Sequence, residues 1–77
     1  MTIEMLLNSI KTIVDYDMIA NGTAFALVKS DKGNYSIRQA FRNGYGEYQG
    51  FTIVRLLKNI SEESAKLEFE DMISQIR

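Results

Sequence analysis

The chain has 77 residues, of which 45% are hydrophobic and 25% charged, with no cysteine, no histidine, no proline and a net charge of −1. Such a composition is typical of one small globular domain, here residues 1–77, and excludes disulfides. The usual zinc ligands, general bases and thiol nucleophiles are absent, so we expect no metal, no cofactor and no enzymatic activity. A chain of this length buries only about 60% of its unfolded surface, so efficient packing or a second copy must stabilise it.

The first apolar pattern has helical spacing. Apolar residues recur every three or four positions, which predicts a helix over residues 2–15 with Thr2 as its N-cap. The segment has no basic beginning and carries Glu4, so we interpret it as an amphipathic helix and not as a signal peptide. No apolar run approaches the roughly 18 residues that span a bilayer, so we expect a cytoplasmic protein without a membrane partner. The apolar stripe comprises Ile3, Leu6, Leu7, Ile10, Ile13 and Val14.

Three strand patterns follow. Residues 23–30, TAFALVKS, are short, aromatic and β-branched at their centre, and turn signals bound them on both sides. Residues 35–42 alternate between apolar and polar side chains, which indicates a half-buried strand. The third strand, residues 51–58, is apolar on both faces, so we expect something to cover its outer side.

The last segment predicts a second helix over residues 62–76. Ser61 is a good N-cap, and Glu62 and Glu63 lie in the first turn, where the helix dipole favours negative charge. The expected buried stripe comprises Ala65, Phe69, Met72, Ile73 and Ile76. The order α-β-β-β-α therefore predicts an α+β domain with a three-stranded antiparallel meander and two helices packed on one face.

The connection before the third strand permits two geometries. Residues 42–50, RNGYGEYQG, contain three glycines and two tyrosines. The Asn-Gly pair at positions 43–44 favours a two-residue type I′ turn, which would pair Arg42 with Tyr45. The alternative is a loose loop over residues 43–49, with strand pairing that begins after it.

The tyrosines of this connection also have two interpretations. In the structural one, they lean back onto the sheet edge. In the functional one, Tyr45 and Tyr48 form an exposed contact patch with Arg42, because tyrosine and arginine often anchor interfaces. The glycines do not match a phosphate-binding loop, since a strand follows them where such a loop requires a helix.

We expect the chain to be a non-enzymatic binding module that acts by protein–protein contact, as a regulator, adaptor or inhibitor, and to form a homodimer. With both helices on one sheet face, the opposite face would present small apolar residues beside arginines, which suits an interface. An accessory inhibitor of a host complex, of the kind that phages and mobile elements carry, fits the small size. The expected platform comprises Ala24, Ala26, Val28 and Ala40. The predicted binding residues are Arg38, Arg42, Tyr45, Tyr48 and Arg55.

The alternative function is nucleic-acid binding through a basic sheet face with tyrosines. Residues 29–60 carry a net charge of +4, and their arginines and tyrosines suit phosphate contact and base stacking. The expected element order resembles that of the double-stranded RNA-binding domain. That family holds phosphate with lysines at the start of its second helix, where this chain has Ser61, Glu62, Glu63 and Ser64. Residues 1–28 and 61–77 carry net charges of −2 and −3, which oppose a general affinity for polyanions.

Overall fold

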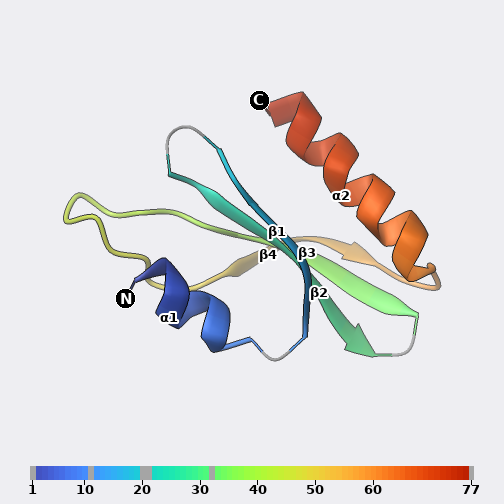
Figure 1. Ribbon diagram of the computed structural model, residues 1–77. Coiled ribbons are helices and arrows are strands. Elements are labelled where there is room, and N and C mark those ends of the chain that lie inside the picture. Colours follow the sequence, from blue (N-terminus) through green and yellow to red (C-terminus); the bar gives the residue numbers. More distant parts are fainter. Residues whose placement is uncertain (1, 11, 20–21, 32, 77) are drawn as a thin grey trace.

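The computed structural model describes residues 2–10, 12–19, 22–31 and 33–76. Its four strands form one antiparallel sheet in the order β1-β2-β3-β4 (Figure 1). The α+β class is confirmed, and the three-stranded meander is corrected to a four-stranded one. Lys11 in the predicted first helix and Lys32 in the predicted first turn lie outside the described residues. The elements are α1 (Ile3–Asn8), β1 (Ile13–Met18), β2 (Ala24–Asp31), β3 (Asn34–Ala40), β4 (Thr52–Leu57) and α2 (Glu62–Ile76).

The additional strand, β1, occupies sequence that the apolar spacing assigned to the first helix. Helix α1 has only six residues and ends at Asn8, with Ser9 as its C-cap. The β-branched run at residues 12–14 favours an extended backbone over a helical one. Thr12 starts the pairing with β2, because its carbonyl accepts the N–H of Lys29 at 3.0 Å. Pairing with β2 therefore overrides the helical spacing of the apolar residues.

One face of the sheet packs against α2. Side chains alternate between the two faces of a strand, so Phe25 and Leu27 of β2 point to the same side. Helix α2 begins as expected, since the N–H of Ser64 donates to the Ser61 hydroxyl oxygen at 3.1 Å. The main core on this side comprises Phe25, Leu27, Tyr35, Ile37, Leu57, Ala65, Phe69 and Ile73.

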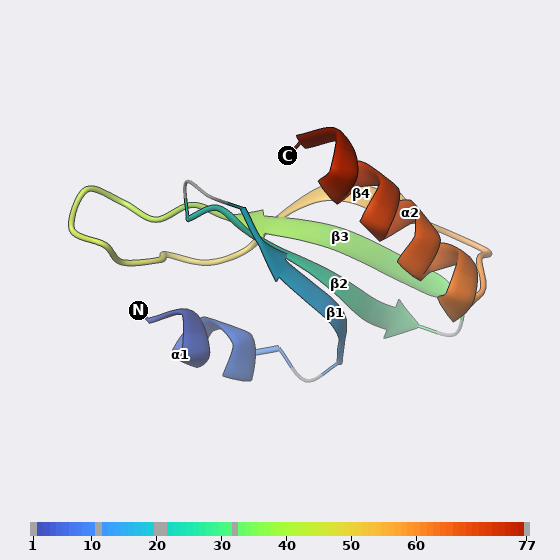
Figure 2. The ribbon, with the colours of Figure 1, turned by 45° about the horizontal axis from the view of Figure 1, so that its top comes forward.

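Helix α1 lies on the opposite face, called here the reverse face (Figure 2). Ala24 pairs with Ala40 on that side, and Leu6 of α1 packs against both, together with Tyr48. Two alanines leave room for a leucine and a tyrosine ring at one end of the sheet. The expectation that both helices pack on one face is therefore corrected. None of the described helices is long and apolar enough to cross a membrane.

Candidate functional site

Among the residues that the structure describes, strand β4 forms one edge of the sheet and pairs only with β3. Thr52 to Leu56 are all exposed, and only Leu57 is buried. Ile53 pairs with Arg38 and Leu56 with Ser36, which places both apolar side chains on the reverse face. The register shifts between these pairs, leaving Val54 as an additional residue. The exposed fractions of Ile53, Val54 and Leu56 are 49%, 42% and 60%. These three residues and the outer backbone of Thr52–Leu57 are called the β4 edge.

Within the described part of the chain this side of β4 stays exposed, so the expected cover would have to come from another molecule. An exposed edge strand with apolar side chains presents unpaired backbone N–H and C=O groups together with apolar surface. Natural proteins usually blunt such an edge with inward charges, prolines or bulges. On β4 the bulge at Val54 and the charge of Arg55 are the devices present, and the apolar residues remain exposed.

Strand β1 forms the other edge, and its side chains hinder pairing with a further strand. The carboxylate of Asp15 accepts the N–H of Tyr16, and that of Asp17 accepts the N–H of Met18, each at 2.8 Å. The register of β1 also shifts between Ile13 and Asp15. Two negative charges, a bulge and occupied N–H groups make β1 a poor template for another strand.

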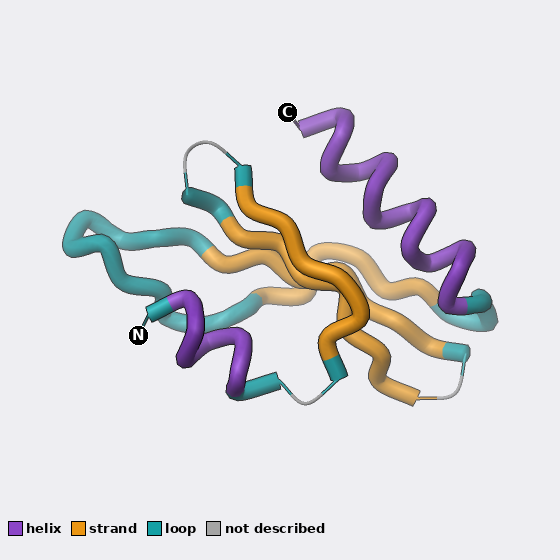
Figure 3. The backbone as a smooth tube through the Cα atoms, viewed as in Figure 1, coloured by secondary structure: helices purple, strands orange, loops and turns teal. Residues whose placement is uncertain are grey.

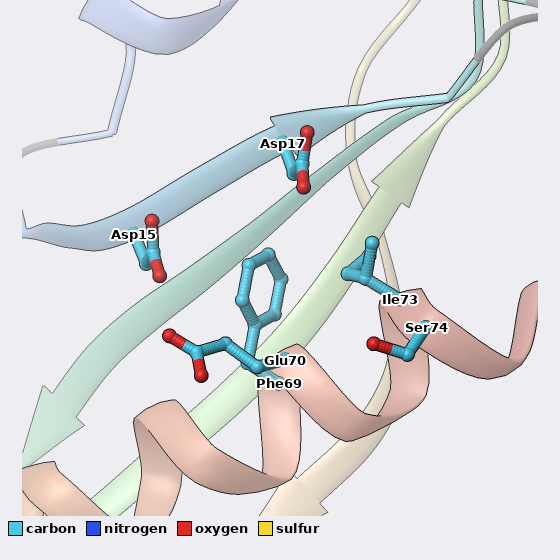
Figure 4. Close-up of a pocket in the computed structure, with 6 residues that line it drawn as sticks. All are labelled: Asp15, Asp17, Phe69, Glu70, Ile73 and Ser74. Atoms are coloured by element: carbon cyan, nitrogen blue, oxygen red, sulfur yellow. The ribbon is translucent and has the colours of Figure 1, made fainter. Parts of the chain in front are cut away.

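An open acidic groove of about 310 Å³ lies between β1 and α2 (Figure 4). Phe69 and Ile73 form its apolar floor, and carboxylates come from the strand and from the helix. Asp15 and Asp17 are already engaged with the backbone of β1. No cluster of carboxylates within the described residues could hold a metal ion. The groove is lined by Asp15, Asp17, Phe69, Glu70, Ile73 and Ser74.

Two of the predicted binding arginines lie on opposite faces of the sheet. Arg38 is half-buried on the reverse face, where its Nε donates to the Ser36 hydroxyl at 3.1 Å. Arg55 pairs with Ile37 and faces α2, where its guanidinium lies 3.4 Å from the Glu68 carboxylate. The structure therefore does not gather the predicted basic residues into one surface.

The connection from β3 to β4 extends beyond the end of the sheet as a long loop (Figure 3). A bridge pairs Arg42 with Tyr48, and the N–H of Asn43 donates to the Glu47 carbonyl at 2.8 Å. The Asn43 side-chain oxygen also accepts the N–H groups of Tyr45 and Glu47. The turn thus encloses five residues, so neither the two-residue turn nor the loose loop describes it fully.

The two tyrosines of this loop have different environments. Tyr45 is 91% exposed at the tip, as a contact residue would be. Tyr48 is only 4% exposed, and its hydroxyl donates to the Gly22 carbonyl. Burial raises the pKa of the neighbouring Tyr16 hydroxyl, and the charges of Tyr48 and Asp17 add to the increase. Tyr48 therefore follows the structural interpretation and Tyr45 remains a candidate contact.

Gly22 meets the same loop at close range. Its φ of 87° lies in the left-handed region, and a Cβ at this position would lie 3.1 Å from Nη2 of Arg42. Glycine suits this position because it tolerates that backbone conformation and leaves space for the guanidinium. The exposed Arg42 side chain therefore lies close to Gly22.

The expected alanine platform on the reverse face is not a free surface. Ala24, Ala26, Val28 and Ala40 are between 0% and 3% exposed. The prediction of a platform at these residues is therefore corrected. The exposed apolar residues of this face lie at its two edges, with Tyr16 and Met18 on β1 and Ile53 and Leu56 on β4.

The sequence analysis noticed the two-faced apolar pattern of β4 and expected something to cover its outer side, but it did not name Ile53, Val54 or Leu56 among the binding residues. The usable signal was the combination of a terminal position in the meander with the sequence TIVRLL. Comparison of the chain with protein-family models, with curated proteins and with solved structures finds no match.

Proposed function

We propose that this protein is a non-enzymatic binding module that contacts another protein through its β4 edge. The observation that carries the proposal is the exposure of Ile53, Val54 and Leu56 on a strand that pairs on one side only. Pairing of β4 with an edge strand of the partner would block that strand for other contacts, which would regulate or inhibit the partner. Such an action needs no catalytic groups.

Strand addition accounts for affinity and specificity by separate contacts. Main-chain hydrogen bonds along the unpaired edge provide affinity, and alternate side chains provide specificity. Fully burying an exposed aliphatic side chain contributes about 1.5–3 kcal/mol. The three apolar residues of the β4 edge are already roughly half-covered, so each would contribute a part of that amount.

Site-specific photo-crosslinking in the cells that encode the protein tests this proposal. A photoreactive phenylalanine analogue placed at Leu56 is expected to give covalent adducts with protein, identified by mass spectrometry. The same analogue at Ile76 is the control, because Ile76 is an exposed apolar residue of α2, 45% exposed. Equal adducts from both positions, or none from Leu56, would contradict a binding role for the β4 edge.

Nucleic-acid binding is the weaker alternative. Arg38 and Arg55 point to opposite sides of the sheet, and Arg55 is already beside Glu68. Charge attraction between protein and nucleic acid is strongest at low salt, so a titration with single-stranded oligonucleotides under that condition is the most sensitive test. We expect it to show no binding. Binding under those conditions would favour the alternative.

A further inference from the structure

We propose that the occupant of the β4 edge is a second copy of this chain, whose β4 pairs antiparallel with the first across a twofold axis. The inference rests on the proposed function and names the partner. The two four-stranded sheets would join into one continuous sheet of eight strands. Three properties of the edge support a second copy: its charge pattern, its side-chain pairing and the closed state of β1.

Charge complementarity is the first support. The flank of α2 beside β4 carries carboxylates, since Glu68 contacts Arg55 and lines a hollow with Asp71 and Leu67. Strand β4 and the residue after it are basic, with Arg55 and Lys58. A twofold axis normal to the sheet places both α2 helices on the same face of the joined sheet. Each basic strand then approaches the acidic helix flank of its partner.

Side-chain pairing selects the position of the axis. In an antiparallel pair of identical strands, the axis passes through a residue that faces its own copy. An axis at Arg55 would place two like charges directly opposite, which is unfavourable. An axis at Leu56 instead pairs the most exposed apolar side chain of β4 with itself. Arg55 then lies opposite Leu57 of the partner, and Val54 opposite the aliphatic stem of Lys58.

The state of β1 explains why such an assembly would stop at two copies. Pairing of β4 with β1 of another copy would be head-to-tail and would build an open fibre. The carboxylates of Asp15 and Asp17 already occupy N–H groups of β1 and add negative charge. Pairing of β4 with itself uses up the open edge of both copies, so the assembly closes as a dimer.

A single introduced cysteine tests the axis, because the chain has no cysteine of its own. Under mild oxidation, purified Leu56→Cys is expected to form a disulfide-linked dimer at least about tenfold faster than Ile76→Cys, since pairing raises the local thiol concentration. Sedimentation of the unmodified protein is expected to give twice the monomer mass of 8.8 kDa. The added variant Leu56→Lys is expected to sediment as a monomer while keeping its circular dichroism spectrum.

Each other outcome overturns a defined part of the inference. Equal crosslinking rates for the two cysteine variants, with a monomer at high concentration, would exclude the second copy. Photo-crosslinks from Leu56 to other proteins would then leave the proposed function standing with a different partner. A dimer that persists in Leu56→Lys and crosslinks poorly through Leu56→Cys would place the interface elsewhere on the chain.

Discussion

Strands β1 and β4 both lie at an edge of the same sheet, and each pairs with a single neighbour within the described part of the chain. On β1, two aspartates accept N–H groups of their own strand. On β4, isoleucine, valine and leucine side chains are about half exposed or more, and the only charge within the strand belongs to Arg55. The comparison teaches that two edges of one sheet can differ in how much of their backbone is available for pairing. The side chains determine whether the backbone N–H and C=O groups of an edge strand are free to pair with another strand.

The largest expected effect is on stability and concerns the end of the sheet near the β1–β2 turn. Tyr48→Ala removes a buried ring and its hydrogen bond to Gly22, so we expect the free energy of unfolding to fall by about 3 kcal/mol. Tyr45→Ala is the matched control, since this exposed tyrosine should change stability by less than about 0.5 kcal/mol. Urea denaturation measures both. Equal losses would contradict the different environments of the two rings.

The second prediction concerns association through β4. Val54→Lys places a second lysine opposite Lys58 of the partner in the proposed pairing, so we expect the dimer dissociation constant to rise about tenfold or more, equivalent to about 1.4 kcal/mol. Stability of the monomer should stay within about 0.5 kcal/mol, because the side chain is exposed. Ile76→Lys provides the control, because the exposed fractions of Val54 and Ile76 are 42% and 45%. Analytical ultracentrifugation over a concentration series measures both dissociation constants. Equal increases in the two variants would contradict association through β4.

The third prediction concerns β1, the edge strand whose aspartates hinder pairing. In a Val54→Lys background, which disfavours pairing of β4, the pair Asp15→Val and Asp17→Val frees the N–H groups of β1 and removes two charges. We expect concentration-dependent association, detected by light scattering, because a β-branched edge without carboxylates resembles β4. Asparagines at positions 15 and 17 keep a side-chain oxygen acceptor and should stay monomeric. Absence of association in the valine variant would mean that the aspartates do not protect this edge.

The smallest effect is expected at the ion pair beside β4. Glu68→Gln removes a contact whose side chains are 46% and 49% exposed, so stability should change by about 0.5 kcal/mol or less. A double-mutant cycle with Arg55→Gln in denaturant unfolding isolates the coupling. A coupling energy well above 1 kcal/mol would show that the ion pair stabilises the fold of one chain. Arg55 and Glu68 would then be less available for charge complementarity between two copies.

Much of the fold was predictable because local signals and packing agree. The N-cap at Ser61 and the stripe of Ala65, Phe69 and Ile73 identified α2 with its bounds. The first helix was too long in the prediction because Ile13 and Val14 continue a helical spacing while belonging to a strand. A period of three or four residues cannot distinguish these outcomes where the apolar residues are β-branched.

The candidate site was less predictable because it depends on register and on distant contacts. The bulge at Val54 shifts the pairing by one residue, and such a shift decides which strand residues share a face with Arg38. Tyr45 and Tyr48 have similar glycine-rich surroundings in the sequence. Only the approach of Gly22, twenty-six positions from Tyr48, separates a buried ring from an exposed one.

The link between Tyr48 and Gly22 also has a consequence for how the domain opens. It joins Gly22, just before β2, to the loop before β4, so opening at either segment breaks a contact of the other. We therefore expect the base of the loop at Tyr48 to be protected from opening to the same degree as that end of the sheet, while the exposed tip opens more readily.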